Sequence, residues 1–585
     1  MRRFLLAAVT MCALVVTPLA PSQAATSNGP TAVGYGGAVS SVDPTATAIG
    51  LDVLRHGGNA VDAAVAVAAA LGVTEPFSAG VGGGGFFVYY DAKSGKVSTI
   101  DGREAAPASM TATSFIDPAT GLEYPFAEAR VSGLSVGVPG TLATWDEALR
   151  RWGKRSLSRS LQPAIDVARQ GFVVDPTFQG QINANAGIFS RFGSTSELYL
   201  PGGQAPAVGS TFRNPDLADT YALVAEDGLD AFYGGDLAAD LVDAVKNPPL
   251  TDPSASWKPG GMTVADLAAY GVRTPEPTHM RYRGYDVYGM ATPSSGGSTV
   301  GEALNILETF DLAGLDRTQA LHRYLEASAL GFADRNAYVG DYTPRSVLDV
   351  LLSDAFAAER ACEIKPDSVL VKPVAPGILE GSYTGCAGTA GAAGTDNGTS
   401  TTNLTVADKW GNVVEYTFTI EQIGGNGVVV PGRGFLLNNE LTDFSLTPTL
   451  NDPNNPGPGK RPRSSMAPTI VLHDGEPFLA LGSPGGATII TTVLQILINR
   501  IDFGMSLSEA IAAPRASQRN GARTTAEPAF ANSPAGLALD ALGHDYTLSA
   551  EIGAATAIEF LGDRLLLAAA EPVRRGSGSA GVVRQ

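Results

Sequence analysis

The segment from Gly398 to Thr405, Gly-Thr-Ser-Thr-Thr-Asn-Leu-Thr, places several hydroxyl groups at the junction of two unlike parts of the chain. Residues 381–400 are mostly Gly, Ala, Thr and Ser, whereas residues 402–420 alternate like a strand hairpin. Cleavage between Ser400 and Thr401 would leave a threonine with a free α-amine beside its own hydroxyl. Such a residue is both nucleophile and base, because an α-amine with a pKa of about 7.7–8 can accept the hydroxyl proton near neutral pH.

The elements that must position this threonine change character along the chain. Helices and strands alternate first, residues 130–350 are largely helical, and the part after residue 400 is rich in strands, with no internal repeat. The predicted elements are strands 31–39, 86–91 and 96–101; helices 44–55, 60–73, 139–152, 158–170, 237–245, 301–312 and 318–338; strands 403–407, 413–420, 434–437, 468–472 and 477–481; helix 487–501; and strands within 554–569.

The composition is that of a large, acidic, globular protein. Of 585 residues, 44% are hydrophobic and 17% are charged, and the formal net charge is −18. An acidic surface repels nucleic acid and anionic membranes, so we expect neither as a partner.

The first 24 residues predict a secretory signal peptide. Arg2 and Arg3 supply the positive end, residues 4–16 are apolar, and Ser22-Gln23-Ala24 has the small residues of a cleavage site. A membrane anchor is the alternative, but the apolar run is too short to span a bilayer. We therefore expect the mature protein to be secreted or periplasmic.

The cysteines and histidines do not predict a metal site. An oxidising compartment favours a disulfide between Cys362 and Cys386, with two free thiols as the alternative. His322 and Glu326 stand four residues apart on a helix, but the sequence places no further ligand near them, so an ordinary polar pair is the prediction. Neither a metal nor an organic cofactor is expected.

Gly80, Gly82 and Gly85 match the pattern of a dinucleotide-binding loop. A helix precedes them and a strand follows, which is the reverse of the order that such a loop requires. We therefore interpret these glycines as positions where backbones pack closely.

Short motifs surround the threonine pair in a distinctive order. Thr-Thr by itself carries little information, because β-branched pairs are common in strands. The motifs are Gly57–Ala63, the glycine loop to Gly85, Asp101–Glu104, Val138–Gly140, Pro293–Gly297, Asp408–Asn412, Tyr416–Thr419, Phe435–Phe444, Lys460–Thr469 and Gly482–Gly486. Together they make the mature chain resemble the γ-glutamyltranspeptidase family over nearly its whole length.

The resemblance implies a fold and a maturation step. The fold is that of the N-terminal-nucleophile hydrolases, an α+β, four-layer αββα sandwich with two antiparallel sheets between helical layers. The family's proenzyme would cut itself into a large subunit, residues 25–400 with a flexible end from 374, and a small catalytic subunit, residues 401–585. The subunits stay interlocked. Residues 446–462, rich in Pro, Asn and Gly, are either a lid over a pocket or a plain surface loop.

The resemblance also implies an activity. A γ-glutamyltransferase or glutathione hydrolase would form a γ-glutamyl ester on Thr401 and pass the acyl group to water, an amino acid or a peptide. Thr419 looks like the hydroxyl that orients Thr401. Gly485 and Gly486 look like the oxyanion hole, because adjacent glycines let two N–H groups point at a developing alkoxide.

The remaining site residues would bind the donor. Arg103, Ser464 and Ser465 look like the clamp for the substrate's α-carboxylate, since a guanidinium can hold a carboxylate with two hydrogen bonds. Glu440 and Asp443 look like the partners of its α-ammonium.

Two positions depart from the family's usual pattern. Asn403 stands where many members have His, and Glu421 stands where Asn is usual. Glu421 adds a third carboxylate for one ammonium, so we expect one acid to be protonated or to point elsewhere. Two alternatives stay open: a related acylase for another side-chain amide such as a glutaryl amide, and an uncleaved, non-catalytic secreted homologue.

Overall fold

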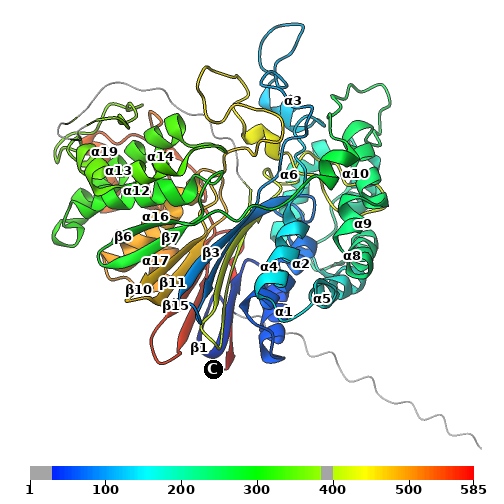
Figure 1. Cartoon of the computed structure of the whole chain (residues 1–585), viewed down its shortest axis with the longest axis horizontal. Coiled ribbons are helices and arrows are strands. Elements are labelled where there is room, and N and C mark those ends of the chain that lie inside the picture. Colours follow the sequence, from blue (N-terminus) through cyan, green and yellow to red (C-terminus); the bar gives the residue numbers. More distant parts are fainter. Residues whose placement is uncertain (1–28, 382, 384–385, 387–399, 585) are drawn as a thin grey trace, which may run out of the picture.

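The computed structural model describes residues 29–381, 383, 386 and 400–584. The predicted signal peptide and residues 387–399 of the predicted flexible end lie outside the described residues. Two antiparallel sheets pack face to face, and a layer of helices covers the outer face of each (Figure 1). This α+β sandwich is the four-layer architecture that the resemblance implied.

The elements have the following bounds. The strands are β1 Thr31–Ser41, β2 Gly84–Asp91, β3 Lys96–Gly102, β4 Phe172–Val173, β5 Thr211–Phe212, β6 Thr278–Tyr282, β7 Tyr285–Gly289, β8 Thr402–Asp408, β9 Val413–Thr419, β10 Thr469–His473, β11 Glu476–Gly482, β12 Ala516–Ser517, β13 Thr524–Ala526, β14 Tyr546–Leu548, β15 Thr556–Phe560, β16 Leu566–Ala570 and β17 Ser579–Arg584. The helices are α1 Pro44–Arg55, α2 Ala60–Thr74, α3 Phe126–Arg130, α4 Thr141–Trp152, α5 Leu157–Gln170, α6 Pro176–Phe189, α7 Gly193–Tyr199, α8 Pro215–Asp227, α9 Leu229–Tyr233, α10 Asp236–Lys246, α11 Val264–Ala268, α12 Gly296–Glu308, α13 Arg317–Tyr338, α14 Arg345–Leu351, α15 Asp354–Ala361, α16 Thr488–Ile501, α17 Leu507–Ala512, α18 Pro528–Ala531 and α19 Pro534–Leu542, with 3₁₀ turns at Pro201–Gly203, Leu312–Gly314 and Glu440–Asp443.

Strand β1 joins the two sheets. One sheet has the order β3-β2-β9-β8-β1 with β17 beside β1, and the other continues from β1 as β16-β15-β11-β10-β7-β6. Residues 31–34 of β1 pair with β16, whereas residues 37–41 pair with β8 and, after a register shift between Tyr35 and Ala38, residues 38–41 pair with β17. Gly36 and Gly37 both have positive φ, +84° and +126°. Side chains rarely tolerate this conformation, so the glycine pair permits the change of partner.

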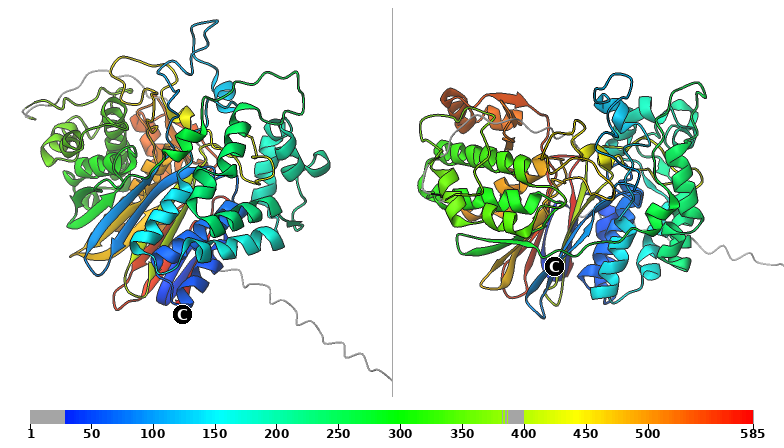
Figure 2. Two further views of the ribbon diagram at one scale, coloured as in Figure 1. Left: turned by 45° about the vertical axis from the view of Figure 1, so that its right-hand side comes forward. Right: turned by 45° about the horizontal axis from the view of Figure 1, so that its top comes forward.

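Helix α2 shows how the sequence builds the layer behind the site. Asn59 caps the helix by accepting from the backbone N–H of Asp62, and Asp62 accepts from that of Asn59 in return. All 15 residues of α2 are buried, as its Ala- and Val-rich sequence predicts. The helix packs on β8 and β9, whereas α12 and α16 cover the other sheet (Figure 2). Among the described helices, none combines the length and apolarity that a membrane crossing requires.

The glycines of the dinucleotide-like pattern lie where backbones approach closely. A Cβ atom on Gly82 would lie 2.0 Å from the carbonyl oxygen of Leu436, and one on Gly85 would lie 2.4 Å from that of Thr417. These contacts agree with the packing role that we inferred for the pattern.

The sequence predicts a strand over residues 434–437, and this prediction is wrong. The segment has irregular backbone, in which Leu436 forms a single bridge with Val429. Gly434 has φ of +71°, which does not fit an extended strand.

The region expected to be largely helical also contains the edge hairpin β6–β7. Thr278, Met280 and Tyr282 are buried while the residues between them are exposed, the alternation of a strand with one covered face. Gly284, with φ of +86°, provides the turn. The strand is short and its neighbours are helical, which hid this pattern in the sequence.

The predicted disulfide is present between Cys362 and Cys386, whose Cα atoms lie 5.6 Å apart. Between the two cysteines, Val374 exchanges hydrogen bonds of 2.7 and 3.0 Å with the side chain of Asn520. The start of the predicted flexible end is therefore anchored to the small-subunit part of the fold.

Candidate active site

Strand pairing brings the two key threonines together. Thr402 pairs with Phe418, which places Thr401, just before β8, beside Thr419, the last residue of β9. The Thr401 hydroxyl donates a hydrogen bond to the carbonyl oxygen of Ser400, and the Thr419 hydroxyl donates to the same oxygen at 3.3 Å. The peptide bond that we expect to break is intact in this structure, and its carbonyl oxygen accepts hydrogen bonds from both hydroxyls.

A cavity of about 20 Å³ lies at this point, which is roughly the space of one water molecule. Its lining is Arg103, Ser400, Thr401, Thr419, Glu421, Glu440, Asp443, Ser464, Ser465, Met466, Gly486 and Ile489. Of the residues predicted for catalysis, donor binding and cleavage, only Gly485 is not in the lining, and it precedes Gly486 directly. A γ-glutamyl group does not fit this volume while the chain before Thr401 stays in place.

The glycine pair precedes helix α16. Gly485 and Gly486 have φ of +138° and +57°, and their carbonyl groups accept from the N–H groups of Thr488 and Ile489. In the part of the chain that the structure describes, neither glycine N–H donates a hydrogen bond. The partial positive charge of a helix N-terminus favours an anion here, so this geometry suits an oxyanion hole.

Arg103 is 1% exposed and pairs with two acids. Its guanidinium donates to the carboxylates of Glu440 and Asp443, and its Nε donates to the carbonyl oxygen of Pro462 at 3.1 Å. Burial raises the pKa of Glu440 to about 7, although the charge of Arg103 opposes the shift. In the uncut chain, the predicted clamps for the carboxylate and the ammonium thus bind each other.

The two serines are held by a neighbouring loop. The N–H of Ser464 donates to the carbonyl of Pro293 at 3.0 Å, and its own carbonyl accepts from the N–H of Ser295 at 2.8 Å. Arg335 donates to the Ser465 hydroxyl at 2.7 Å. Sequence reasoning missed Arg335, because only the fold brings the end of α13 to this loop.

Glu421 is built into the turn that follows Thr419. Its φ is +79°, its N–H donates to the Thr419 hydroxyl at 2.8 Å, and its carbonyl accepts from the N–H of Ser400 at 3.2 Å. Its carboxylate accepts from the side chain of Asn439. Glu421 therefore contacts the predicted cleavage site through its backbone and lines the cavity with its side chain.

The three acids of the cavity repel one another. Burial raises the pKa of Glu421 well above its usual range, and the charges of Asp443 and Glu440 raise it further. We expected one of the three acids to be protonated or to point elsewhere, and the direction of this shift favours the neutral form of Glu421.

Asn403, the other departure, belongs to a buried polar network behind the cavity. Its amide donates to Glu415 at 2.6 Å and to the Thr556 hydroxyl at 2.8 Å, and its oxygen accepts from the Thr417 hydroxyl at 2.5 Å. Thr556 lies on β15, so the network links the sheet that carries Thr401 to the other sheet. Asn403, Glu415 and Thr417 are polar residues that alternate with apolar ones along the two predicted strands. This alternation was the sequence signal from which a shared polar network could have been predicted.

We expect Glu415→Gln to stabilise the protein increasingly as pH rises. Burial raises the pKa of Glu415 well above its usual range. Unfolded glutamate ionises near a pKa of about 4.3. Above that pH the unfolded chain releases a proton that the folded chain keeps, so wild-type stability falls by about 1.4 kcal/mol per pH unit up to the folded pKa. Glutamine does not ionise, so the variant lacks this pH-dependent loss of stability.

Melting temperatures of both proteins at pH 5 and pH 8 measure this effect. The exposed Glu476→Gln on β11 is the matched control and should show no such trend. A Gln variant that gains nothing between the two pH values would contradict a protonated Glu415.

The expectation that no further ligand lies near His322 and Glu326 is wrong. His544 is buried beside them, with its Nε2 2.8 Å from Nδ1 of His322 and 3.7 Å from Oε1 of Glu326. The fold alone brings α13 and the residues after α19 together. Lys372 also binds Glu326 at 2.7 Å, so an ammonium group already neutralises the carboxylate.

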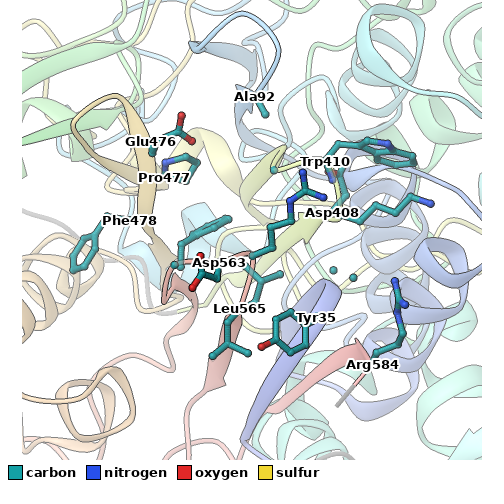
Figure 3. Close-up of a pocket in the computed structure, with 18 of the residues that line it drawn as sticks. Tyr35, Ala92, Asp408, Trp410, Glu476, Pro477, Phe478, Asp563, Leu565 and Arg584 are labelled. Atoms are coloured by element: carbon teal, nitrogen blue, oxygen red, sulfur yellow. The ribbon is translucent and has the colours of Figure 1, made fainter.

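Two other cavities of at least 630 Å³ lie among the described residues. One of about 630 Å³ lies beside the small cavity and shares Asp443 with it, and residues of the 446–462 loop line it. Another of about 1050 Å³ lies beside Asp408, at the opposite end of β8 from Thr401, and is bordered by Tyr35 and Trp410 (Figure 3). None of the predicted site residues lines this distant cavity.

Comparison with known proteins defines the class. A cephalosporin acylase from Bacillus halodurans has a similar structure, with a TM-score of 0.81 and 30% identity, covering 97% of this chain and 99% of that one. The architecture is that of an N-terminal-nucleophile hydrolase.

Sequence comparison defines the family. The gamma-glutamyltranspeptidase family model matches residues 46–581. The glutathione hydrolase proenzyme of Bacillus subtilis (strain 168) is 42% identical over 488 residues, 83% of this chain and 81% of the relative. The acylase ACY 1 proenzyme of Pseudomonas sp. (strain SE83) is 36% identical over 553 residues, 92% of each. The chain belongs to the gamma-glutamyltranspeptidase family.

Proposed function

We propose that the chain is an exported proenzyme that cuts itself between Ser400 and Thr401 and then acts on γ-glutamyl amides such as glutathione. The observation that carries the proposal is the contact of the Thr401 hydroxyl with the carbonyl group of Ser400, inside a cavity lined by the predicted donor-binding residues. This contact supports an attack by the same oxygen first on its own chain and later on a substrate.

In the first step, the Thr401 oxygen would attack the carbonyl carbon of Ser400. The C–N bond breaks, the nitrogen leaves as the α-amine of Thr401, and water then hydrolyses the Ser400 ester to a carboxylate. Removal of the preceding chain enlarges the cavity, and the large and small subunits stay joined by the shared sheets.

In the mature enzyme, the α-amine would take the Thr401 hydroxyl proton as the oxygen attacks the γ-carbonyl of the donor. The Gly485 and Gly486 N–H groups would bind the oxyanion, and the α-ammonium group would return the proton to the leaving amine. The γ-glutamyl ester then passes to water, an amino acid or a peptide. The cavity beside Asp443 has room for the leaving group and the acceptor.

The remaining residues of the cavity would bind the two charged groups of the donor, its α-carboxylate and its α-ammonium. Its α-carboxylate would replace the acids that pair with Arg103 in the uncut chain, with Ser464 and Ser465 completing the hydrogen bonds. Its α-ammonium would then bind Glu440 and Asp443. Protonated Glu421 can add a hydrogen bond without adding charge.

An acylase of the glutaryl type is the second candidate, since an acylase proenzyme matches the chain over 92% of both lengths. We expect kcat/KM for a γ-glutamyl anilide to exceed that for the glutaryl anilide by roughly a hundred-fold, because only the first has an ammonium for the buried acids. The two anilides differ only in the amine, so each controls for the other. Faster cleavage of the glutaryl anilide would establish the acylase instead.

A further inference from the structure

Arg575 lies beside the predicted nucleophile, on the loop between β16 and β17. Its Nη1 donates a hydrogen bond of 2.9 Å to the carbonyl oxygen of Thr401. Covalent geometry places that oxygen roughly 3 Å from the nitrogen of the same residue, so Nη1 of the guanidinium lies within roughly 6 Å of the atom that would become the α-amine. No motif of the family resemblance includes Arg575.

The backbone around Arg575 is held from both parts of the chain. Its φ is +51°, and its N–H donates to the Glu551 carboxylate at 3.2 Å. The hydroxyl of Thr177, on α6, donates to its carbonyl oxygen at 3.5 Å. Gly576 has φ of +75°, and a Cβ there would lie 2.7 Å from the same hydroxyl. Residues of both predicted subunits therefore hold the backbone from which the guanidinium extends.

Few charges offset the guanidinium near neutral pH. The acids that face it are Glu75, at the end of α2, and Glu551. Burial raises the pKa of Glu75 to about 8, and the charges of Asp43 and Asp175 add to the rise although Arg575 opposes it. Glu75 is therefore mostly protonated at pH 7, and its charge does not cancel that of Arg575.

The other side of Thr401 faces the cavity charges. Arg103, Glu421, Glu440 and Asp443 line that side, and Arg103 is paired with two of the acids. Bound substrate brings its own ammonium and carboxylate to the same groups. Arg575 contacts the Thr401 backbone and does not line the cavity, so substrate leaves it in place.

We propose that Arg575 is a positioning residue that holds the Thr401 carbonyl and, through its positive charge, keeps the α-amine unprotonated at neutral pH. The proposal rests on the proposed function, in which that amine is the base. A nearby like charge disfavours the ammonium form and lowers its pKa. A unit charge at roughly 6 Å, in an effective dielectric of 20 or somewhat more, shifts a pKa by about one to two units.

The test is the pH dependence of kcat/KM for a γ-glutamyl anilide, measured on the cleaved enzyme. In Arg575→Gln we expect the acid-side pKa to rise by about one unit or more, which lowers kcat/KM about ten-fold at pH 6 and much less at pH 9. The loss should fall on kcat with KM little changed. Arg575→Lys should keep a profile near wild type, and Arg564→Gln, an exposed arginine at the distant cavity, should leave it unchanged.

Equal loss at all pH values in Arg575→Gln, or a Lys variant as impaired as the Gln variant, would leave only a structural role. A measurement on the wild type avoids any folding defect: the pH dependence of α-amine labelling at Thr401, read by mass spectrometry of the small fragment. We expect a pKa at or below about 7, under the usual 7.7–8. A pKa above 8 overturns this inference alone, whereas a small fragment that does not begin at Thr401 overturns the proposed function.

Discussion

Thr401→Ala is expected to leave a single uncut chain with no γ-glutamyl hydrolysis, because it removes the oxygen that would attack both Ser400 and the donor. Loss of a catalytic nucleophile typically lowers kcat by four or more orders of magnitude. A denaturing gel shows the first effect, since the wild type should give two fragments and the variant one. N-terminal sequencing of the smaller wild-type fragment should begin at Thr401.

Thr402→Val is the matched control for this variant. Thr402 is the next residue on β8, it is buried, and its hydroxyl has no hydrogen-bond partner among the described residues. A valine has nearly the same shape, so this variant should still cleave and retain activity. Thr401→Ser should also cleave, because it keeps the attacking oxygen. Two fragments in Thr401→Ala, or an active wild type that stays one chain, would refute the assignment of Thr401.

Arg103→Met is expected to damage both stability and donor binding. The substitution leaves the buried carboxylate of Glu440 and the partly buried carboxylate of Asp443 without their cation. Breaking a buried ion pair in this way typically costs about 3–5 kcal/mol. The donor's α-carboxylate also loses a charged hydrogen-bond partner, so KM for a γ-glutamyl anilide should rise roughly a hundred-fold. Chemical denaturation and steady-state kinetics measure the two effects.

The pH dependence of the stability loss identifies its cause. Glu440 has a pKa raised to about 7 even beside Arg103, so acid pH neutralises it and removes part of the penalty. The deficit of Arg103→Met should therefore be larger at pH 8 than at pH 5. Arg281→Met, which removes a loose 3.9 Å contact of a mostly exposed arginine with Asp286, should cost less than about 1 kcal/mol. Equal costs for the two variants would contradict the buried-pair argument.

Local patterns predicted many elements because short-range chemistry decides them. Helix α2 follows from an Ala- and Val-rich run with a capping Asn59, and β8 and β9 follow from alternation on either side of a tight turn. The segment 434–437 failed because its apolar residues look like a strand while Gly434 bends the backbone. The conformation of such a segment depends on its packing partners, which lie far away in the sequence.

The small cavity at Thr401 also combines residues that the sequence predicted with contacts that only the fold creates. The short sequence motifs contain nearly all of the residues that line the cavity, because each motif has a recognisable residue type at the position that contacts the site. Arg335, Arg575 and the link from Asn403 to Thr556 were not found, since each acts through a contact between distant segments. The paired state of Arg103 with Glu440 was also hidden, because it depends on what fills the site.

The amino-acid order by itself determined the family, because the order of the short motifs is read directly from the sequence, and the family resemblance implied the layered α+β architecture and the candidate site residues. Only the tertiary structure decided the electrostatics: which acids are buried together, which cation lies beside Thr401, and that the Ser400 carbonyl accepts a hydrogen bond from the Thr401 hydroxyl. Those properties depend on burial and on distances across the fold, because the strength of a charge interaction varies with both.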